Sequence, residues 1–387
     1  MRFPTLVRFF TAAALFFGVV AAFLVPPFQS PDEYNHFFRA YQLSEGHFSA
    51  ETLNGNRLGG TLPGSLLALK SLFSPLKNNY EARTGAADFK KAIALRLEPG
   101  QRRFIDFPNT AVYAPLAYAA RLANLAVWIA LVVFAIRTIP FYRAGLAALA
   151  LLPASLAIAA SANADVVTNG LSFWLVAVFC SQAQRLNGLK LAELAAVSWT
   201  KLVLFPLALL TGLSAFRRFS DWKPALRKSL FPLFIAALVA GAWGAMAGRQ
   251  FISYDQYDPE LRDEQTLNPG VHPGRQLAFV LSHPVDFAAV VLRSGIKALP
   301  SAGAHVVGKF GWEKNYLPAW VIALLWAGLI AIASVERNPL SRAQRCWLGV
   351  IIVFSVSLWA VTMYALWCPV GSSELDNWQG RYFVPLT

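Results

Sequence analysis

Long apolar blocks with few charges dominate this chain and restrict what it can fold into. Each block holds about 17–25 residues, which is enough for a helix to cross a bilayer core of about 30 Å. Only 14% of the 387 residues are charged and the mean hydropathy is +0.46, whereas soluble domains carry roughly a quarter charged residues. We therefore predict an all-α polytopic membrane protein and exclude a soluble enzyme or a disordered chain. The blocks fall near residues 7–25, 119–136, 144–162, 166–184, 190–214, 229–247, 317–334 and 346–367.

The charges between the blocks predict an orientation. Basic residues concentrate on the cytoplasmic side of membrane proteins, so Arg2 and Arg8 predict a cytoplasmic N-terminus that continues into an uncleaved first helix. The segments assigned to the inner side then hold 14 basic residues and two acids, and the outer segments hold 18 of the 21 acids. This asymmetry predicts a single membrane domain, 1–387, in the bacterial inner membrane, with outer segments at 26–118 and 248–316.

The block at 190–214 fits this orientation only if it is interrupted. As one helix it would carry the basic cluster at 217–228 to the outer side and invert every later segment. Two short helices with a bend near Trp199-Thr200-Lys201 remove the conflict and predict nine transmembrane helices. Because an interrupted helix at membrane depth needs protein or a watery cavity around it, we expect Lys201 to face a cavity near the outer surface.

The two outer segments differ in character. The first, at 26–118, is a large loop with turn sequences such as Asn54-Gly55-Asn56 and with helical pieces. The second contains an amphipathic stretch, Pro284–Leu299, that is typical of a helix lying along the membrane surface. The net charge of +13 comes without a basic stripe containing aromatics, so we expect no nucleic-acid partner. The three cysteines are too scattered for a disulfide framework or a zinc site.

The most informative stretch is Pro31-Asp32-Glu33-Tyr34-Asn35-His36-Phe37-Phe38-Arg39, directly after the first helix. If Ser30-Pro31 opens a helix, Asp32, His36 and Arg39 lie on one face of it. Asp32 or Glu33 could then take a proton from an acceptor hydroxyl, with His36 beside it, or Asp32 could hold a divalent cation. The structural alternative is that both acids simply favour a helix N-terminus.

Two further candidates stand at the outer ends of later helices. Asp165, with Asn163 and Asn169, lies at a membrane boundary, where ionisable groups are costly and often functional; alternatively, it caps a helix. Lys201 could bind a phosphate or extend its amine to the interface.

The fourth candidate follows the last apolar block. In Gln379-Gly380-Arg381-Tyr382 the guanidinium of Arg381 suits bidentate phosphate binding, with Gln379 and Tyr382 beside it. The neighbouring aromatics also fit an interfacial belt, which is the structural alternative. All four candidates map to the outer mouth of the helices, an arrangement that suits a substrate with its lipid tail in the bilayer and its phosphate at the interface.

These motifs carry a resemblance. Pro-Asp-Glu-x-x-His at 31–36, Ser-x-Asn-x-Asp at 161–165 and Gln-Gly-Arg-Tyr at 379–382 resemble the signatures of a family of predicted bacterial membrane proteins of unknown function. That family in turn looks like the GT-C glycosyltransferase superfamily, whose members use polyprenyl-phosphate-linked sugars. The resemblance implies a catalytic or metal-binding acid in the first outer loop, here Asp32 or Glu33. Family members usually continue past the last motif, so we expect this chain to be a shortened form.

The leading hypothesis is therefore an inverting glycosyltransferase that moves a sugar from a polyprenyl-phosphate donor to an envelope glycan or lipid. Asp165 would orient the acid or the sugar, while Lys201 and Arg381 neutralise the phosphate. A transporter or flippase for lipid-linked glycans is the alternative, and it requires charges distributed through the membrane depth. A non-catalytic scaffold for envelope assembly is the third hypothesis.

Overall fold

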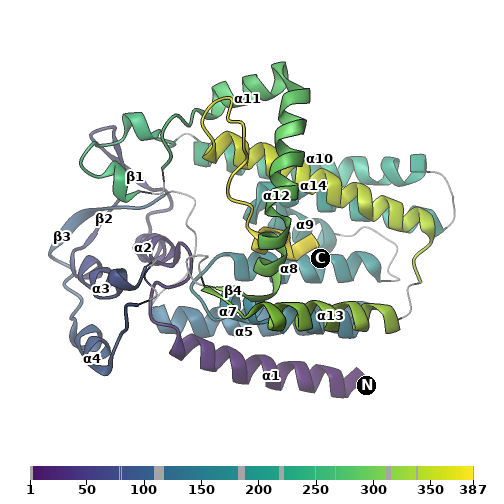
Figure 1. Ribbon diagram of the computed structural model, residues 1–387, viewed down its shortest axis with the longest axis horizontal. Helices are drawn as coiled ribbons and strands as arrows, with labels where there is room; N and C mark the ends of the chain where they lie inside the picture. Colours follow the sequence, from purple (N-terminus) through teal and green to yellow (C-terminus); the bar gives the residue numbers. More distant parts are fainter. Residues whose placement is uncertain are drawn as a thin grey trace.

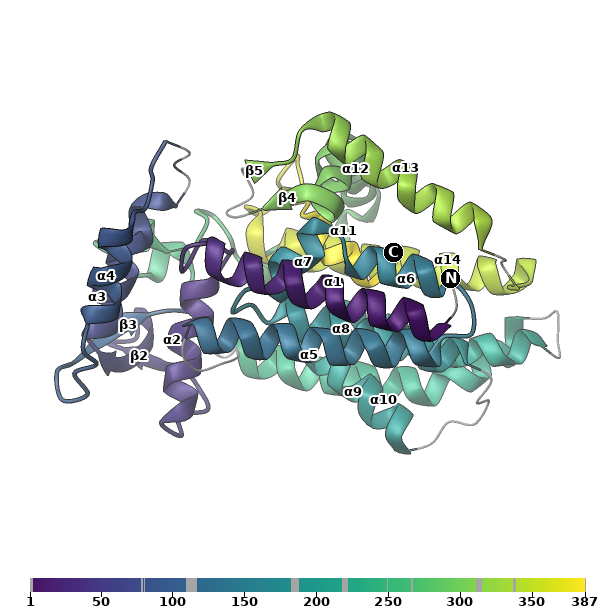
Figure 2. The same cartoon turned by 90° about the horizontal axis from the view of Figure 1, so that it is seen from below.

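The computed structural model describes residues 3–77, 79, 81–108, 117–181, 188–217, 222–248, 250–265, 267–310, 315–336 and 339–386. Over these residues the protein is mostly helical, as predicted (Figure 1). A bundle of long helices forms one part, and a smaller unit with helices and strands lies at one end of it (Figures 1 and 2). The stretches 109–116 and 311–314, near the ends of the two predicted outer segments, lie outside the described residues.

The elements follow in chain order. The α-helices are α1 (Phe3–Leu24), α2 (Glu33–Ser44), α3 (Ser65–Phe73), α4 (Ala86–Ala94), α5 (Ala117–Thr138), α6 (Arg143–Ala150), α7 (Pro153–Ala159), α8 (Asp165–Cys180), α9 (Gly188–Thr200), α10 (Trp222–Gly248), α11 (Pro273–Ser282), α12 (Pro284–Gly308), α13 (Ala319–Val335) and α14 (Arg342–Trp367). The 3-10 helices are η1 (Ser74–Leu76), η2 (Leu202–Arg217), η3 (Tyr254–Gln256), η4 (Arg262–Glu264) and η5 (Gly380–Leu386). The strands are β1 (Glu51–Leu53), β2 (Arg57–Pro63), β3 (Arg102–Asp106), β4 (Lys309–Phe310) and β5 (Asn315–Tyr316).

Among the described residues, four helices are long and apolar enough to cross a membrane: Phe3–Leu24, Ala120–Thr138, Trp222–Met246 and Arg342–Trp367. A fifth span results if α11 and α12, which are bent by 105° relative to each other, are counted together. The helices α8 and α13 and the 3-10 helix η2 are apolar but shorter. Helix length thus supports a membrane protein with four to five spans, and the count of nine remains a prediction.

Two apolar blocks are interrupted. The single helix predicted over 144–162 is wrong, because α6 ends at Ala150 and α7 begins at Pro153. A proline lacks the backbone N–H and disfavours helical backbone at the residue before it, and Leu152 has an extended ψ of 141°. The interruption predicted near Lys201 is confirmed, since α9 ends at Thr200 and the 3-10 helix η2 begins at Leu202.

The bundle encloses an apolar core, and a carboxylate joins two of its helices at the start of α6. Side chains from α1, α5, α8, η2 and α14, among them Phe10, Trp128 and Leu175, form the core. Glu336, just after α13, accepts hydrogen bonds from the backbone N–H groups of Ala144 and Gly145, both at 3.0 Å. Since the first N–H groups of a helix have no partner within it, Glu336 caps α6 and ties it to α13.

The smaller unit, which we call the outer unit after the predicted outer segment 26–118 that supplies its helices and strands, contains a small sheet that the all-helical prediction did not include. Strands β1, β2 and β3 pair antiparallel in that order. The turn sequence between β1 and β2 was recognised correctly, because Asn54 and Gly55 both adopt positive φ, at 53° and 73°, as short hairpins favour. A second apolar core, containing Phe37 and Phe38 of α2 and Phe73 of α3, packs beneath the sheet. Helix α2 thus belongs to the outer unit and faces the bundle (Figure 1).

The second predicted outer segment packs on the first. The Tyr257 hydroxyl donates to Asp106 Oδ1 at 2.6 Å, and Arg57 forms a bidentate pair with the same carboxylate at 3.1 and 2.6 Å. The predicted amphipathic helix is present as α12, which begins at Pro284 and extends to Gly308. It crosses the direction of α13 and α14 (Figure 1), and Leu292, Ile296 and Leu299 on it are exposed.

Candidate functional site

The backbone conformation of Asp32 places this residue outside the helix that follows it. Asp32 has a left-handed φ of 60° and stands just before the first residue of α2, Glu33. The prediction that Ser30-Pro31 opens the helix is therefore wrong, because the chain makes a turn there, with the Glu33 N–H donating to the Ser30 carbonyl at 3.2 Å. The Asp32 side chain makes no capping hydrogen bond and is 41% exposed. A carboxylate in this position is accessible to a substrate.

Glu33, by contrast, is enclosed and paired with an arginine. Its Oε1 accepts from Arg121 Nε at 2.7 Å and its Oε2 from Arg121 Nη2 at 2.8 Å, and each side chain is 1% exposed. Oε1 also accepts from the Ala162 N–H at 3.1 Å. Arg121 donates further to the carbonyl groups of Ala22, Val25 and Pro26. The Glu33–Arg121 pair thus holds together α1, α2, α5 and the turn before α8.

Asp165, Lys201 and Arg381 form a cluster of charges next to Asp32. Lys201 Nζ lies 2.6 Å from Asp165 Oδ1. The guanidinium of Arg381 lies between two acids, with Nε 4.0 Å from Asp165 Oδ2 and Nη2 3.9 Å from Asp32 Oδ2. These residues come from α8, the interruption after α9, η5 and the turn before α2, so the structure brings together the four candidates at one end of the bundle.

Neighbouring polar residues hold this cluster in place. The Asn163 side chain accepts from the Asp165 N–H at 2.8 Å and donates to the Pro31 carbonyl at 3.2 Å, which joins two of the motifs. Gln379 Oε1 accepts from Arg381 Nε at 2.7 Å. Lys201 Nζ lies 4.5 Å from the centre of the Tyr382 ring, a cation–π distance.

A glycine allows Arg381 to reach its position. A Cβ on Gly380 would come within 2.1 Å of the Ala302 carbonyl oxygen and 2.9 Å of the Val306 nitrogen, both on α12. Only a residue without a Cβ permits this close approach of two backbones. The Gly380-Arg381 pair therefore fixes the guanidinium relative to α12.

His36 lies one turn after Asp32 on α2, and its backbone N–H donates to the Asp32 carbonyl at 3.0 Å. Burial lowers the pKa of His36, while the charges of Asp32 and Asp165 act in the opposite direction and that of Arg381 lowers it again. Its Nδ1 is buried and has no hydrogen-bond partner among the described residues. Burial of His36 thus favours its uncharged form, and the charges that act on the imidazole include those of the cluster.

Two predicted site residues have other surroundings. Arg39 does not share the face of Asp32 as predicted but donates to the Gln42 side chain and to the His47 and Phe48 carbonyl groups, which holds the chain after α2. Asn169, one turn into α8, is 2% exposed, and its Oδ1 has no hydrogen-bond partner among the described residues. Neither has a contact with Asp32, Lys201 or Arg381 among the interactions of the described residues.

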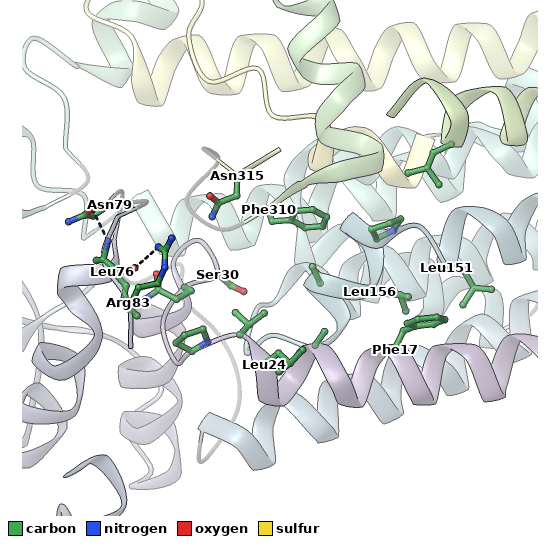
Figure 3. A pocket seen from close by; sticks show the side chains of 18 residues that line it. Phe17, Leu24, Ser30, Leu76, Asn79, Arg83, Leu151, Leu156, Phe310 and Asn315 are labelled. Carbon is green, nitrogen blue, oxygen red and sulfur yellow. Dashed lines mark hydrogen bonds between the residues drawn. The ribbon is translucent and has the colours of Figure 1, made fainter. Parts of the chain in front are cut away.

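A mostly apolar groove of about 800 Å³ lies beside the turn that carries Asp32. Its walls include Phe17 and Leu24 of α1 together with Leu151 and Leu156, and polar side chains of Ser30, Asn79 and Arg83 also line it. Figure 3 shows Asn79 and Arg83 at one end and Phe17 and Leu151 at the other. The groove therefore combines an apolar trough with one cationic side chain, Arg83, at its end, and the charged cluster of Asp32, Asp165, Lys201 and Arg381 is not part of its lining.

The surroundings of Asp32 do not fit a divalent cation held by protein side chains. Among the described residues no group of three His, Cys, Asp or Glu side chains converges as at a metal site. The charged group near Asp32 Oδ2 is the cationic Arg381, which would repel a metal ion. We therefore assign no step to a metal.

Sequence reasoning missed Arg121, although a signal for it was present. It lies inside the apolar block at 119–136, and an arginine in such a block generally has an acidic partner. The partner, Glu33, lies 88 residues earlier, and nothing local in the sequence indicates that pairing.

Comparison with known proteins adds one finding. A family model described as "Predicted membrane protein (DUF2142)" matches residues 15–121 and 113–387. No curated protein and no solved structure matches the chain.

Proposed function

The chain belongs to the DUF2142 family of predicted membrane proteins, and from its site we propose that it is a glycosyltransferase using a polyprenyl-phosphate-linked sugar. The observation that carries the proposal is the position of Arg381, within 4.0 Å of both Asp32 and Asp165 and in one cluster with Lys201. Two cations next to an accessible acid offer both a phosphate site and a general base. The GT-C-like architecture, with nine crossings, is part of the same proposal.

In this proposal the reaction takes place on the outer face of a bacterial inner membrane, with the N-terminus in the cytoplasm. Asp32 accepts the proton of the acceptor hydroxyl while the oxygen of that hydroxyl attacks C1 of the donor sugar. The bond from C1 to the phosphate oxygen breaks with inversion, and the polyprenyl phosphate leaves. Lys201 and Arg381 neutralise the negative charge that develops on the leaving group.

Asp165 acts on the cations in this scheme. Its carboxylate pairs with Lys201 at 2.6 Å and holds that ammonium against the Tyr382 ring, with Asn163 fixing the start of α8. His36, which lies next to Asp32, is a second candidate for the group that accepts the proton of the acceptor hydroxyl. Glu33 is the weaker candidate for the base, because both of its oxygens already accept hydrogen bonds.

The groove beside Ser30 supports the lipid part of the proposal. Its apolar walls lie along α1 and near α7, and its cationic end with Arg83 is near the outer unit. A polyprenyl tail placed between these helices would keep its phosphate at the outer end of the bundle. A polyprenyl tail has no polar groups, so the apolar walls of the groove are suited to bind it.

The test is a mass-spectrometric comparison of envelope glycans from the wild-type strain, a deletion strain and strains expressing variants at wild-type level. Asp32→Asn should cause loss of the same sugar as the deletion, while Asp286→Asn, an exposed acid on α12, should leave the glycans unchanged. If only the deletion alters the glycans, Asp32 is not a base, and a transporter or a scaffold explains the data better. Unchanged glycans in both strains would contradict the transferase proposal altogether.

A further inference from the structure

The side of α12 that faces the protein holds the C-terminal segment that carries Arg381. Ser294 Oγ accepts a hydrogen bond from the Leu375 N–H at 2.9 Å, and Ser294 is 5% exposed. A Cβ on the next residue, Gly295, would come within 3.1 Å of the Trp378 ring. The aromatic side chain therefore lies directly against the backbone of α12.

Further contacts continue this attachment toward the charged cluster. Lys297 Nζ donates to both carboxylate oxygens of Glu374, at 2.9 and 3.0 Å. Farther along α12, the backbone of Ala302 leaves no room for a Cβ on Gly380. The C-terminal segment thus contacts α12 from Glu374 to Gly380, and Arg381 is the next residue. The position of the Arg381 guanidinium therefore follows the position of α12.

Another side of α12 is apolar and exposed. Four large aliphatic residues on it have 66–79% of their surface exposed: Val285, Leu292, Ile296 and Leu299. They are separated by seven, four and three positions, which places them on one side of an α-helix. Leu281, at the end of α11, is also 75% exposed. Exposed apolar surface of this extent is typical of a contact with a membrane or with another protein.

The remaining side of α12 and its orientation favour a membrane. Charged, exposed residues occupy this third side: Asp286, Arg293 and Lys297. Helices with separate apolar and charged sides lie in the plane of a bilayer surface. Figure 1 shows that α12 crosses the direction of α14, which is long and apolar enough to span the bilayer. It is also joined to the apolar helix α13, where Trp326 Nε1 donates to the Gly303 carbonyl at 3.2 Å.

We propose that the apolar side of α12 lies on the phospholipid bilayer and that this contact positions Arg381 through the C-terminal segment. The acyl chains contact Leu292 and Ile296, and the charged side of the helix faces water. This inference goes beyond the proposed function and does not depend on it, because it concerns how one residue of the charged cluster is held. It requires no donor sugar and no transfer.

Two competing explanations predict different results. In the first, a second copy of the chain covers the apolar side of α12. In the second, contacts within the protein, such as those of Val306 and Val307 in the main core, hold α12 in place without any help from lipid. Accessibility of the apolar side distinguishes the first explanation, and the mobility of the C-terminal segment distinguishes the second.

The first measurement locates the apolar side. Nitroxide labels are attached at L292C, R293C or I296C of the full chain, with the three native cysteines replaced by alanine, in phosphatidylcholine nanodiscs. Collisions with oxygen, which concentrates in lipid, should exceed collisions with a water-soluble nickel chelate at positions 292 and 296. Position 293 should show the reverse. Access of the nickel chelate to all three positions would overturn the proposal, as would protection of 292 and 296 from both reagents, which indicates a protein partner.

The second measurement tests the link to Arg381 and retains the native cysteines. Hydrogen exchange of residues 374–386 is followed by mass spectrometry in the same nanodiscs. L292N/I296N should accelerate exchange there about threefold or more through local opening, with the unfolding temperature and the exchange of α5 unchanged. I93N/L97N is the matched control, because this pair in the outer unit has the same spacing and is 84% and 51% exposed. It should exchange as the wild type does.

Ser294→Ala serves as the reference for a broken attachment. It removes the acceptor of the Leu375 N–H and leaves the apolar side intact, so residues 374–386 should again exchange faster. Wild-type exchange in this variant would mean that α12 does not hold the segment, and the proposal would fail. Wild-type exchange in L292N/I296N would remove the role of lipid. Faster exchange throughout the chain would also contradict the proposal, since it indicates a general loss of structure.

Discussion

Glu33 and Arg121 form a bidentate ion pair, with Nε–Oε1 and Nη2–Oε2 distances of 2.7 and 2.8 Å, and each side chain is 1% exposed. The pair connects the first turn of α2 to the N-terminal part of α5. Asp32, the residue directly before Glu33, is exposed and makes no capping hydrogen bond. Two adjacent acids thus have opposite surroundings, and they should respond differently to substitution.

Glu33→Gln should lower the free energy of unfolding by about 3–5 kcal/mol, because it leaves the buried charge of Arg121 without its counter-charge. Thermal unfolding in detergent micelles measures the effect, with Glu260→Gln, an exposed acid, as the control. Adding Arg121→Gln should cost less than the sum of the single changes. A Glu33→Gln variant that is as stable as the wild type would contradict the structural role of the pair.

Gly380→Ala should move Arg381 away from the cluster. The new Cβ would overlap the Ala302 carbonyl oxygen at 2.1 Å, and relief of such a clash typically costs about 1–3 kcal/mol. Both the unfolding temperature and sugar transfer should fall. Gly349→Ala in α14, where a Cβ meets nothing within 4 Å, is the matched control and should retain both. Equal behaviour of the two variants would mean that the close approach to α12 has no role.

Arg381 should tolerate lysine better than alanine. Lysine keeps a positive charge near Asp32 and Asp165 but loses the planar fork, whereas alanine loses both. We expect about a 10²–10³-fold loss of transfer rate for Arg381→Ala, as for other groups that stabilise developing charge, and a smaller loss for Arg381→Lys. Rates with a synthetic polyprenyl-phosphate sugar test this order, and Arg293→Ala, exposed on α12, serves as the control. Small and equal effects would argue against a phosphate at Arg381.

His36 should make stability depend on pH. Burial lowers its pKa in the folded state, so between that pKa and the unfolded value of about 6.5 the unfolded chain binds more protons. Stability is therefore fully present above about pH 6.5 and declines as the pH falls below it. Unfolding temperatures at pH 5.5, 6.5 and 7.5 should decrease toward acid for the wild type, less so for His36→Gln. His283→Gln, exposed next to α12, should keep the wild-type slope.

Apolar pattern and charge balance predicted much of the helical part. The first apolar block, 7–25, is α1 (Phe3–Leu24), and the block at 166–184 is α8 (Asp165–Cys180). Charge balance alone predicted the interruption at Lys201. The break before Pro153 was missed, since the proline lies inside a continuous apolar block and hydropathy does not register the lost backbone hydrogen bond.

The parts that the sequence could not predict depend on pairing over long separations. Strands β2 and β3 pair although they lie about 45 residues apart in the chain, with Gly59 opposite Asp106, and no local signal marks such a partner. The choice between Asp32 and Glu33 as the base was left open for a related reason. The two adjacent acids are distinguished by the positive φ of Asp32 and by the pairing of Glu33 with Arg121, and no local feature of the sequence shows either of these.

The hydrogen bond from Tyr257 to Asp106 joins residues 151 positions apart. A second contact of the same kind follows, since the Asp258 N–H donates to the Asn56 carbonyl. The outer unit is therefore assembled from two stretches of chain that are separated by helices of the bundle. A fragment cut from the first stretch alone would lack the side of the sheet that Tyr257 covers. Formation of the outer unit therefore requires residues that precede and follow several bundle helices in the chain, so the unit cannot be completed before those helices have been synthesised.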